Sequence, residues 1–265
     1  AILIYGCDLG VAGAAAATTF SRFAAMVLMM VLLTNKTHEV YIDFRAKFRF
    51  DWAMIRKILF IGVPSSVENS IFELGRILVV GIISGFGTVQ IAANAVANTM
   101  DSMGVIIGKA MGLAILTVVG QCVGTGDYNV VKFYIKKCMK LTYLLHIAWN
   151  ALLFATLPLT IRLFHLSPET QKLALLLIVI HNGCGMVIWP MSFAFPNALR
   201  AANDARFTMA VSMTSMIVCR IGMSLVLADY FAMGAVGVWI AMVIDWIARS
   251  TCFWLRYRSG KWQKY

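Results

Sequence analysis

Polar side chains interrupt two neighbouring apolar stretches of the chain, and their types and spacing suit the binding of a cation or a proton. An ionisable group at the centre of a lipid bilayer costs roughly 3 kcal/mol on insertion scales, so such groups within an apolar span indicate function. The polar residues of the two stretches are Glu68, Glu73, Arg76, Gln90, Asn94, Asn98 and Asp101.

The acidic residues of this set form the predicted cation- or proton-binding site. Glu68 lies about ten residues into the first stretch, a depth of about 15 Å in a helix, and Asp101 is comparably deep in the second. Asn94, Asn98 and Asp101 share one helical face because they are spaced i, i+4, i+7. Carboxylate and amide oxygens are suitable ligands for Na⁺, and carboxylates also accept protons. We rank Glu68 and Asp101 ahead of Glu73.

A structural role is the alternative for several of these residues. Glu73 precedes Arg76 by three residues and can simply form an ion pair with it. Asparagine side chains within membrane helices also hydrogen-bond across to neighbouring helices. Glu68 and Glu73 are five residues apart, about 140° around a helix, so we do not expect them to face one pocket together.

A substrate-binding polar cavity is predicted beside the acidic residues. A lone histidine in such a span is more often a packing residue, and the Cys and His residues lack metal-ligand spacing. The turn GQCVGTGD lacks the GxxxxGK[ST] pattern, and no Ser/His/Asp arrangement is evident, so we expect neither an enzyme nor a cofactor or metal beyond Na⁺. The predicted cavity residues are Asn69, Asn94, Asn98, His181 and Asn182.

The composition shows what must position these residues. The chain has 265 residues, of which 60% are hydrophobic and 13% are charged, whereas a soluble domain has about 25% charged residues. Several apolar stretches are long enough to cross a bilayer as helices, so we predict an all-α polytopic membrane protein. The seven predicted transmembrane helices cover residues 10–33, 58–83, 89–119, 131–157, 168–196, 206–227 and 234–255.

The basic residues predict the orientation of these spans. Seventeen of the 23 Lys and Arg residues fall on the side of the connections that also holds the C-terminal tail, and two fall on the other side. Basic connections stay in the cytoplasm, so we expect a cytoplasmic C-terminus and an outer N-terminal end in a plasma membrane. This distribution explains the net charge of +11 without a nucleic-acid partner.

A short internal repeat suggests the domain organisation. Two glycines and an alanine recur at a constant offset of 224 residues near the start of the first and seventh spans. Transporters are often built from repeated bundles. We therefore expect residues 1–34 to be the last helix of an N-terminal bundle, 35–57 a cytoplasmic loop, and 58–265 a six-helix bundle. The missing N-terminal bundle would precede Ala1. The repeated residues are Gly10, Gly13 and Ala17, and Gly234, Gly237 and Ala241.

Other intramembrane residues are assigned structural roles. Three glycines spaced four residues apart in the third span predict a close helix-packing face. An ion pair is expected among Asp245, Arg249 and Arg220, since Arg249 follows Asp245 by one turn. The spaced glycines are Gly104, Gly108 and Gly112.

The chain resembles the multidrug and toxic compound extrusion (MATE) transporters in the segments GVPSSVENSIFELGRILV, SGFGTVQIAANAVAN, GQCVGTGD and WPMSFAFPNALRAANDARFTM. The resemblance implies a fold of twelve helices in two six-helix bundles, of which this chain would hold the sixth helix and the C-terminal bundle. Several members use a glutamate where this chain has Phe72, and a Tyr and an Asp where it has Gly185 and Trp189. The acidic role would then move to Glu68, Glu73 or Asp101.

Three functions are weighed. The preferred one is a Na⁺- or H⁺-coupled antiporter that exports organic, often cationic, compounds by alternating access, with the lipid bilayer and the missing bundle as partners. The alternative is a lipid-linked oligosaccharide flippase of the same superfamily, but its cationic candidates Arg76, Lys109 and Arg220 are accompanied by acids. A seven-helix receptor ranks third, because the repeat and the buried acids argue against it.

Overall fold

The computed structural model describes residues 10–35, 41 and 50–264, and within these residues all regular structure is helical. The chain divides into two compact units, Ala1–Trp52 and Ala53–Tyr265. The predicted inter-bundle loop, residues 35–57, includes this division, but its last residues, 52–57, belong to the first helix of the second unit rather than to a loop. Most of it, residues 36–40 and 42–49, lies outside the described residues.

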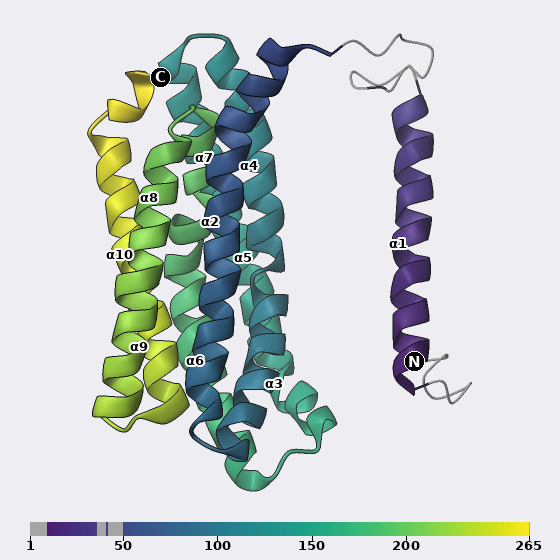
Figure 1. Ribbon diagram of the computed structural model, residues 1–265, viewed down its shortest axis with the longest axis vertical. Helices are drawn as coiled ribbons and strands as arrows, with labels where there is room; N and C mark the ends of the chain where they lie inside the picture. Colours follow the sequence, from purple (N-terminus) through teal and green to yellow (C-terminus); the bar gives the residue numbers. More distant parts are fainter. Residues whose placement is uncertain (1–9, 36–40, 42–49, 265) are drawn as a thin grey trace. The chain divides into compact units, whose positions relative to one another are not determined.

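The described part of the first unit is dominated by α1 (Gly10–Thr34), which matches the first predicted span. The second unit is a bundle whose long helices run side by side (Figure 1). Its α-helices are α2 (Trp52–Ser84), α3 (Thr88–Gly104), α4 (Ile106–Gly124), α5 (Tyr128–Thr160), α6 (Pro168–Trp189), α7 (Pro196–Ala201), α8 (Ala205–Ser215), α9 (Met223–Leu225) and α10 (Gly234–Arg258). Short 3₁₀ or π segments are η2 (Ile161–Phe164), η3 (Pro190–Ala194), η4 (Met216–Gly222), η5 (Val226–Tyr230) and η6 (Lys261–Lys264).

The bundle has the membrane-spanning character that the composition predicts. Six helical stretches of the described chain are long and apolar enough to cross a bilayer. The helix α2 is not among them, because Glu68, Glu73 and Arg76 make it more polar although it has 33 residues. The six stretches are Gly10–Thr34, Ile106–Gly124, Tyr128–Phe164, Pro168–Ala201, Ala205–Tyr230 and Gly234–Arg258.

The third predicted span is not one continuous helix, and this corrects the sequence analysis. The chain forms α3 and α4, which are separated at Val105. Side chains of α5 reach the interruption, where Trp149 donates to the Met103 carbonyl at 2.8 Å and Asn150 to the Gly104 carbonyl at 3.1 Å. Such insertion of side chains into a helical ladder is a common cause of helix interruption.

The fifth span changes its hydrogen bonding at its prolines. Pro190 opens the π segment η3, in which the Phe195 amide donates to the Pro190 carbonyl at 2.9 Å. A proline lacks the amide hydrogen that an α-helical ladder requires, and π turns of this kind are frequent at functional sites. The change places the side chains of η3 and α7 against the centre of the bundle.

The two helices that carry the proposed repeat, α1 and α10, have the same length and similar first residues. Both α1 and α10 have 25 residues, and each begins on a glycine with a positive φ, 48° at Gly10 and 56° at Gly234. Glycine adopts this conformation without the steric cost of a Cβ. In α10, a Cβ on Gly237 would lie 2.7 Å from the Leu227 carbonyl carbon, so this glycine permits close packing on η5.

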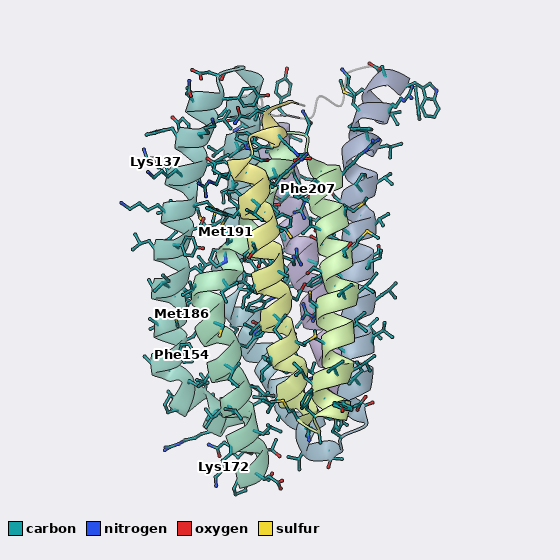
Figure 2. All side chains as sticks on the ribbon, turned by 90° about the vertical axis from the view of Figure 1, so that its left-hand side faces the viewer. Lys137, Phe154, Lys172, Met186, Met191 and Phe207 are labelled. Atoms are coloured by element: carbon teal, nitrogen blue, oxygen red, sulfur yellow. The ribbon has the colours of Figure 1, made fainter. Side chains whose placement is uncertain are left out.

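Buried side chains join the helices of the bundle in two apolar clusters. One contains Trp239 together with residues of α3 and α6, and the other contains Trp189, Trp246 and Trp262 with residues of α4, α5 and α7. Many large apolar side chains face outward instead, such as Leu144 on α5, as expected for helices that contact lipid. Figure 2 shows the side chains that project from the bundle.

Candidate functional site

A cavity of about 490 Å³ lies within the second unit and is lined by eight acidic or basic side chains. Its wall is formed by α2, α3, α4, α6, η3, α7, η4 and α10. The volume is in the range of small-molecule sites, which is roughly 300–1,000 Å³. Of the predicted site residues, it contains Glu68, Asn69, Glu73, Asn98, Asp101 and His181.

Glu68 lies in the cavity wall between two arginines. Its Oε1 accepts a hydrogen bond from Arg200 Nη2 at 2.6 Å and lies 3.9 Å from Arg249 Nη2. Its side chain is only 7% exposed. The Glu68 carboxylate therefore balances the positive charge of Arg200 and Arg249. Its predicted role in cation binding would require displacing these partners.

Asp101 and His181 form the second acidic group of the cavity. Asp101 Oδ1 lies 3.0 Å from His181 Nδ1, with the histidine 1% exposed and the aspartate 22% exposed. The His181 ring also contacts Trp239 and Trp246, at centroid distances of 4.6 and 4.2 Å. The two atoms lie within hydrogen-bond distance, but neither ring nitrogen of His181 has a partner in hydrogen-bond geometry among the described residues. His181 is therefore a neighbour of Asp101 as well as a packing residue.

Glu73 also lines the cavity, which corrects the expectation that it and Glu68 face different directions. Its carboxylate lies 3.1 Å from Arg76, and both side chains are more than half exposed. The alternative considered from the sequence, a local pair with Arg76, is present. The cavity therefore reaches the side of α2 that carries Glu68 and the side that carries Glu73.

Only part of the predicted Asn94–Asn98–Asp101 face lines the cavity, and Asn94 has a structural role. Asn98 and Asp101 line the cavity, whereas Asn94 is buried and accepts a hydrogen bond from Trp239 Nε1 at 3.0 Å. Asn98 in turn donates to Asn94 Oδ1 at 3.0 Å. Asn94 therefore joins α3 to α10, the role of asparagine that was considered as the alternative.

Asn182 does not line the large cavity, contrary to its predicted role. It borders small spaces of about 10 Å³ beside Asn150, at the interruption between α3 and α4. Asn182 lies here because Gly104 of the third span has no side chain and lets Asn150 and Asn182 approach its backbone. A Cβ on Gly104 would lie 2.9 Å from Asn150 Oδ1 and 3.0 Å from Asn182 Nδ2.

Two arginines of the cavity were not predicted as site residues. From the sequence, Arg200 and Arg249 were counted among the cytoplasmic basic residues, but the structure places both in the cavity wall. The Arg249 guanidinium lies 4.4 Å from the Phe193 ring centroid and 5.6 Å from that of Phe72. The available signal was Asp245, an acid one turn before Arg249 that marks this part of α10 as polar.

The predicted ion pair of the last two spans is present in part. Arg220 Nη1 lies 3.9 Å from Asp245 Oδ2, and Ser215 hydrogen-bonds the other oxygen of Asp245. Arg249 instead donates to Ser212 Oγ at 3.0 Å. Asp245 is fully buried, so it lies behind the wall and balances the Arg220 charge from there.

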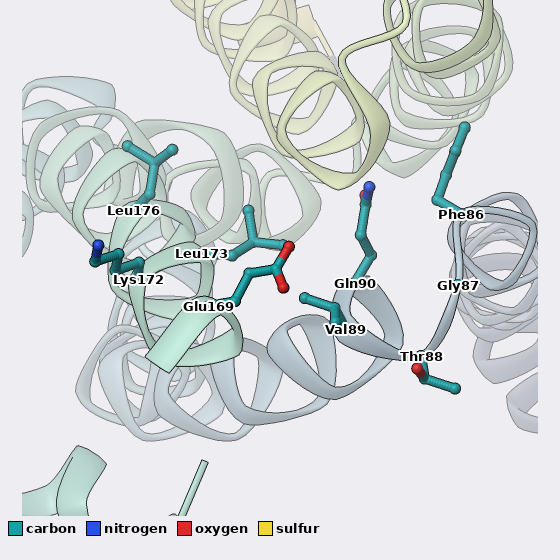
Figure 3. Close-up of a pocket in the computed structure, with 9 residues that line it drawn as sticks. All are labelled: Phe86, Gly87, Thr88, Val89, Gln90, Glu169, Lys172, Leu173 and Leu176. Carbon is teal, nitrogen blue, oxygen red and sulfur yellow. The ribbon is translucent and has the colours of Figure 1, made fainter. Parts of the chain in front are cut away.

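A second hollow, of about 610 Å³, lies at one end of the bundle, between the α2–α3 connection and the start of α6 (Figure 3). It contains none of the predicted site residues. Gln90 of this hollow accepts a hydrogen bond from the Ala235 amide at 2.5 Å, which satisfies the first turn of α10. Within the described residues, no group of three or more His, Cys, Asp or Glu residues has the arrangement of a metal site.

A polytopic helical bundle around a charged cavity is the architecture of a membrane transporter. The family model MatE matches residues 64–226, and the chain belongs to this family. The chain is 27% identical over 258 residues to a probable multidrug resistance protein NorM of Thermotoga maritima, covering 97% of the chain and 55% of the relative. It is 25% identical over 260 residues to the uncharacterized transporter YisQ of Bacillus subtilis, covering 96% and 55%. Its relatives are named as transporters, not enzymes.

Solved structures share the fold. A multidrug resistance MATE family transporter of the MOP superfamily in an outward-facing conformation matches with a TM-score of 0.84 and 21% identity, covering 100% of this chain and 59% of that chain. A MOP superfamily transporter from Pyrococcus furiosus, whose binding pocket is described as having reverse polarity, matches at 0.82 and 22%, covering 100% and 60%. The chain thus spans somewhat more than half the length of these relatives.

Proposed function

We propose that the full-length protein exports organic compounds by alternating access and couples this export to the entry of H⁺ or Na⁺. Membership of the MatE family and the drug-resistance names of its relatives support export of small molecules. The oligosaccharide flippase alternative has no comparable support among these names. The observation that carries the proposal is the charged cavity of about 490 Å³ in the middle of the bundle.

Asp101 is the proposed coupling group. It differs from Glu68 because none of the arginines that the structure describes forms an ion pair with it. It differs from Glu73 because its side chain is 22% exposed, whereas that of Glu73 is 65% exposed. Its neighbour His181 carries a ring nitrogen 3.0 Å from the Asp101 carboxylate. A proton taken up by the Asp101–His181 pair, or a Na⁺ bound by Asp101 and neighbouring amide oxygens, would compete with a cationic group of the substrate.

The second bundle supplies only one wall of the proposed pathway. Transporters built from repeated bundles bind substrate near the bilayer midplane, between the repeats. The matching lengths of α1 and α10 and the partial coverage of the relatives support a preceding bundle that ends with α1. The bundles would then open the cavity alternately to the two sides of the plasma membrane.

The proposed orientation places the C-terminal tail in the cytoplasm. Lys137 projects from α5, and Lys172 lies near the start of α6 at the opposite end of the bundle (Figure 2). The Lys137 end holds most of the basic connections, whereas the Lys172 end holds few, as the positive-inside rule requires.

Efflux from proteoliposomes under separately imposed gradients tests the proposed coupling. The full-length protein should export a cationic dye faster under one of the two gradients, pH or Na⁺, than under the other. The gradient that drives faster efflux identifies the coupling ion. Dye efflux that is independent of both gradients would refute the coupling.

Thiol labelling tests the proposed orientation. A Ser259→Cys variant, in a background without other cysteines, should be labelled by an impermeant thiol reagent only from the cytoplasmic side.

A further inference from the structure

The charge of the cavity differs from what export of simple cations requires. Five basic side chains and three acidic ones line it, and the buried Asp245 behind Arg220 brings the acids to four. Together these nine side chains carry a net charge of +1. The basic residues are Arg76, Lys109, Arg200, Arg220 and Arg249, and the lining acids are Glu68, Glu73 and Asp101.

The acids already have partners. Glu73 lies beside Arg76, Glu68 beside Arg200, and Asp245 beside Arg220, while Asp101 lies beside a histidine. Within the described part of the chain, only Arg76 and Arg200 of these basic residues have an acid at hydrogen-bond distance. Arg220 has Asp245 to itself at 3.9 Å, whereas the acid at 3.9 Å from Arg249 is Glu68, which is already bonded to Arg200.

Arg249 is a buried arginine without an acid of its own within the described residues. Its side chain is 3% exposed, yet neither Nε nor Nη1 has a hydrogen-bond partner among the residues that the structure describes. Burying an arginine with unsatisfied donors costs several kcal/mol, which a ligand with acceptor oxygens would offset. The planar guanidinium presents donors in a fork that matches a carboxylate, sulfonate or phosphate.

Aromatic rings surround the same guanidinium. Phe193 and Phe72 lie 4.4 and 5.6 Å from it and meet each other edge-on at 5.7 Å. Trp189 stacks on Phe193 at 5.0 Å, and both rings line the cavity. An aromatic framework can pack on these rings while an acidic substituent reaches Arg249.

We propose that the cavity binds aromatic organic compounds that carry an anionic oxygen group, and that Arg249 binds this group. The inference rests on the proposed function for the statement that ligands of this cavity are transported. Compounds that also carry a basic group satisfy Asp101 at the same time, because both residues line one cavity. Arg249 is then a residue that determines specificity for zwitterionic over purely cationic substrates.

Binding of two dyes to the purified full-length protein in detergent tests the proposal. Rhodamine 123 is the methyl ester of rhodamine 110, so the dyes share a cationic ring system and differ in one carboxylate. Fluorescence anisotropy should show that rhodamine 110 binds roughly tenfold more tightly, as expected for a hydrogen-bonded charged pair. Equal affinities, or tighter binding of rhodamine 123, would overturn the proposal.

Variants assign the preference to Arg249. Arg249→Gln should abolish the preference and retain rhodamine 123 binding, and Arg249→Lys should restore part of it. Arg258→Gln is the matched control, because Arg258 also lies on α10 over an aromatic ring, that of Trp254, but does not line the cavity. A preference that persists in Arg249→Gln contradicts the assignment. The wild-type preference decides the question even where a variant does not fold.

Two further measurements distinguish binding of the dye from binding of a lipid headgroup, and binding from coupling. Added phosphatidylglycerol that displaces rhodamine 110 at low concentration would assign the site to a lipid headgroup and overturn the proposal. Binding is measured without any ion gradient, so a failure of H⁺ or Na⁺ coupling leaves this result unaffected. Conversely, Asp101→Asn tests the coupling and should leave the preference for rhodamine 110 in place.

Discussion

At the scale of single residues, Glu68 and Asp101 differ in what surrounds their carboxylates. Glu68 is held by Arg200 at 2.6 Å and faces Arg249 at 3.9 Å, whereas the neighbour of Asp101 is His181. Removing one member of a buried ion pair leaves the other charge without a partner. Glu68 is therefore expected to contribute chiefly to stability and Asp101 chiefly to coupling.

Neutralising Glu68 should destabilise the protein far more than neutralising Glu73. Glu68→Gln removes the charge that balances the partly buried Arg200 and the buried Arg249, at a cost of about 3 kcal/mol. The pair of Glu73 and Arg76 is more than half exposed, so Glu73→Gln should change stability by about 0.5 kcal/mol or less. Thermal unfolding of the two full-length variants measures the difference. Equal unfolding temperatures would show that Glu68 is not a structural counter-charge.

The sequence located the polar residues but not their partners. The depth of Glu68 and the face shared by Asn98 and Asp101 follow from local spacing, and these residues line the cavity. The Glu68–Arg200 contact joins residues 132 positions apart, so no helical periodicity predicts it. Asp204 shows the same limit. It is the N-cap residue of α8, but its side chain makes no capping bond and instead accepts from Arg256 at 2.7 Å, another contact between residues far apart in the sequence.

At the scale of helices, glycine spacing positions the wall of the cavity. A Cβ on Gly108 would collide with the Trp189 ring, and one on Gly112 would lie 2.7 Å from Asn197 Nδ2. The predicted close-packing face of the third span is confirmed by these contacts. Through them α4 lies directly against the end of α6 and against α7, which carry Trp189 and Arg200 into the cavity.

A side chain at Gly108 should therefore disrupt the bundle. Gly108→Val forces Trp189 to move, and overpacking of this kind costs about 2 kcal/mol. Gly120→Val is the control on the same helix, because a Cβ there meets no atom of the described residues within 4 Å. The helix propensity of valine affects both variants alike. The unfolding temperature should fall only for Gly108→Val, and an equal fall in both would refute the packing role.

Helix ends were predicted well where the signal was local. Ser167 caps α6 by accepting from the Thr170 amide at 3.4 Å, with Pro168 at the first helical position, and a serine followed by a proline is a sequence pattern typical of a helix start. The interruption at Val105 was missed because it depends on Trp149 and Asn150, which come from another helix. Apolar periodicity alone gave no reason to divide that span.

At the scale of the whole molecule, the account depends on a partner bundle. The chain covers 55% of the NorM relative and 59% of the structure in the outward-facing conformation. The repeat that the sequence suggests between α1 and α10 predicts a first bundle built like the second. Alternating access requires both bundles, so the proposed activity belongs to the full-length protein.

The central claim is that Asp101 couples ion entry to export, and dye efflux by the full-length Asp101→Asn variant tests it most directly. Proteoliposomes under the driving gradient should show efflux for the wild type and for Glu169→Gln, whose acid lies in the hollow at the end of the bundle. Asp101→Asn should fold and bind rhodamine 110 but lose gradient-driven efflux. Efflux at the wild-type rate in Asp101→Asn would contradict the account.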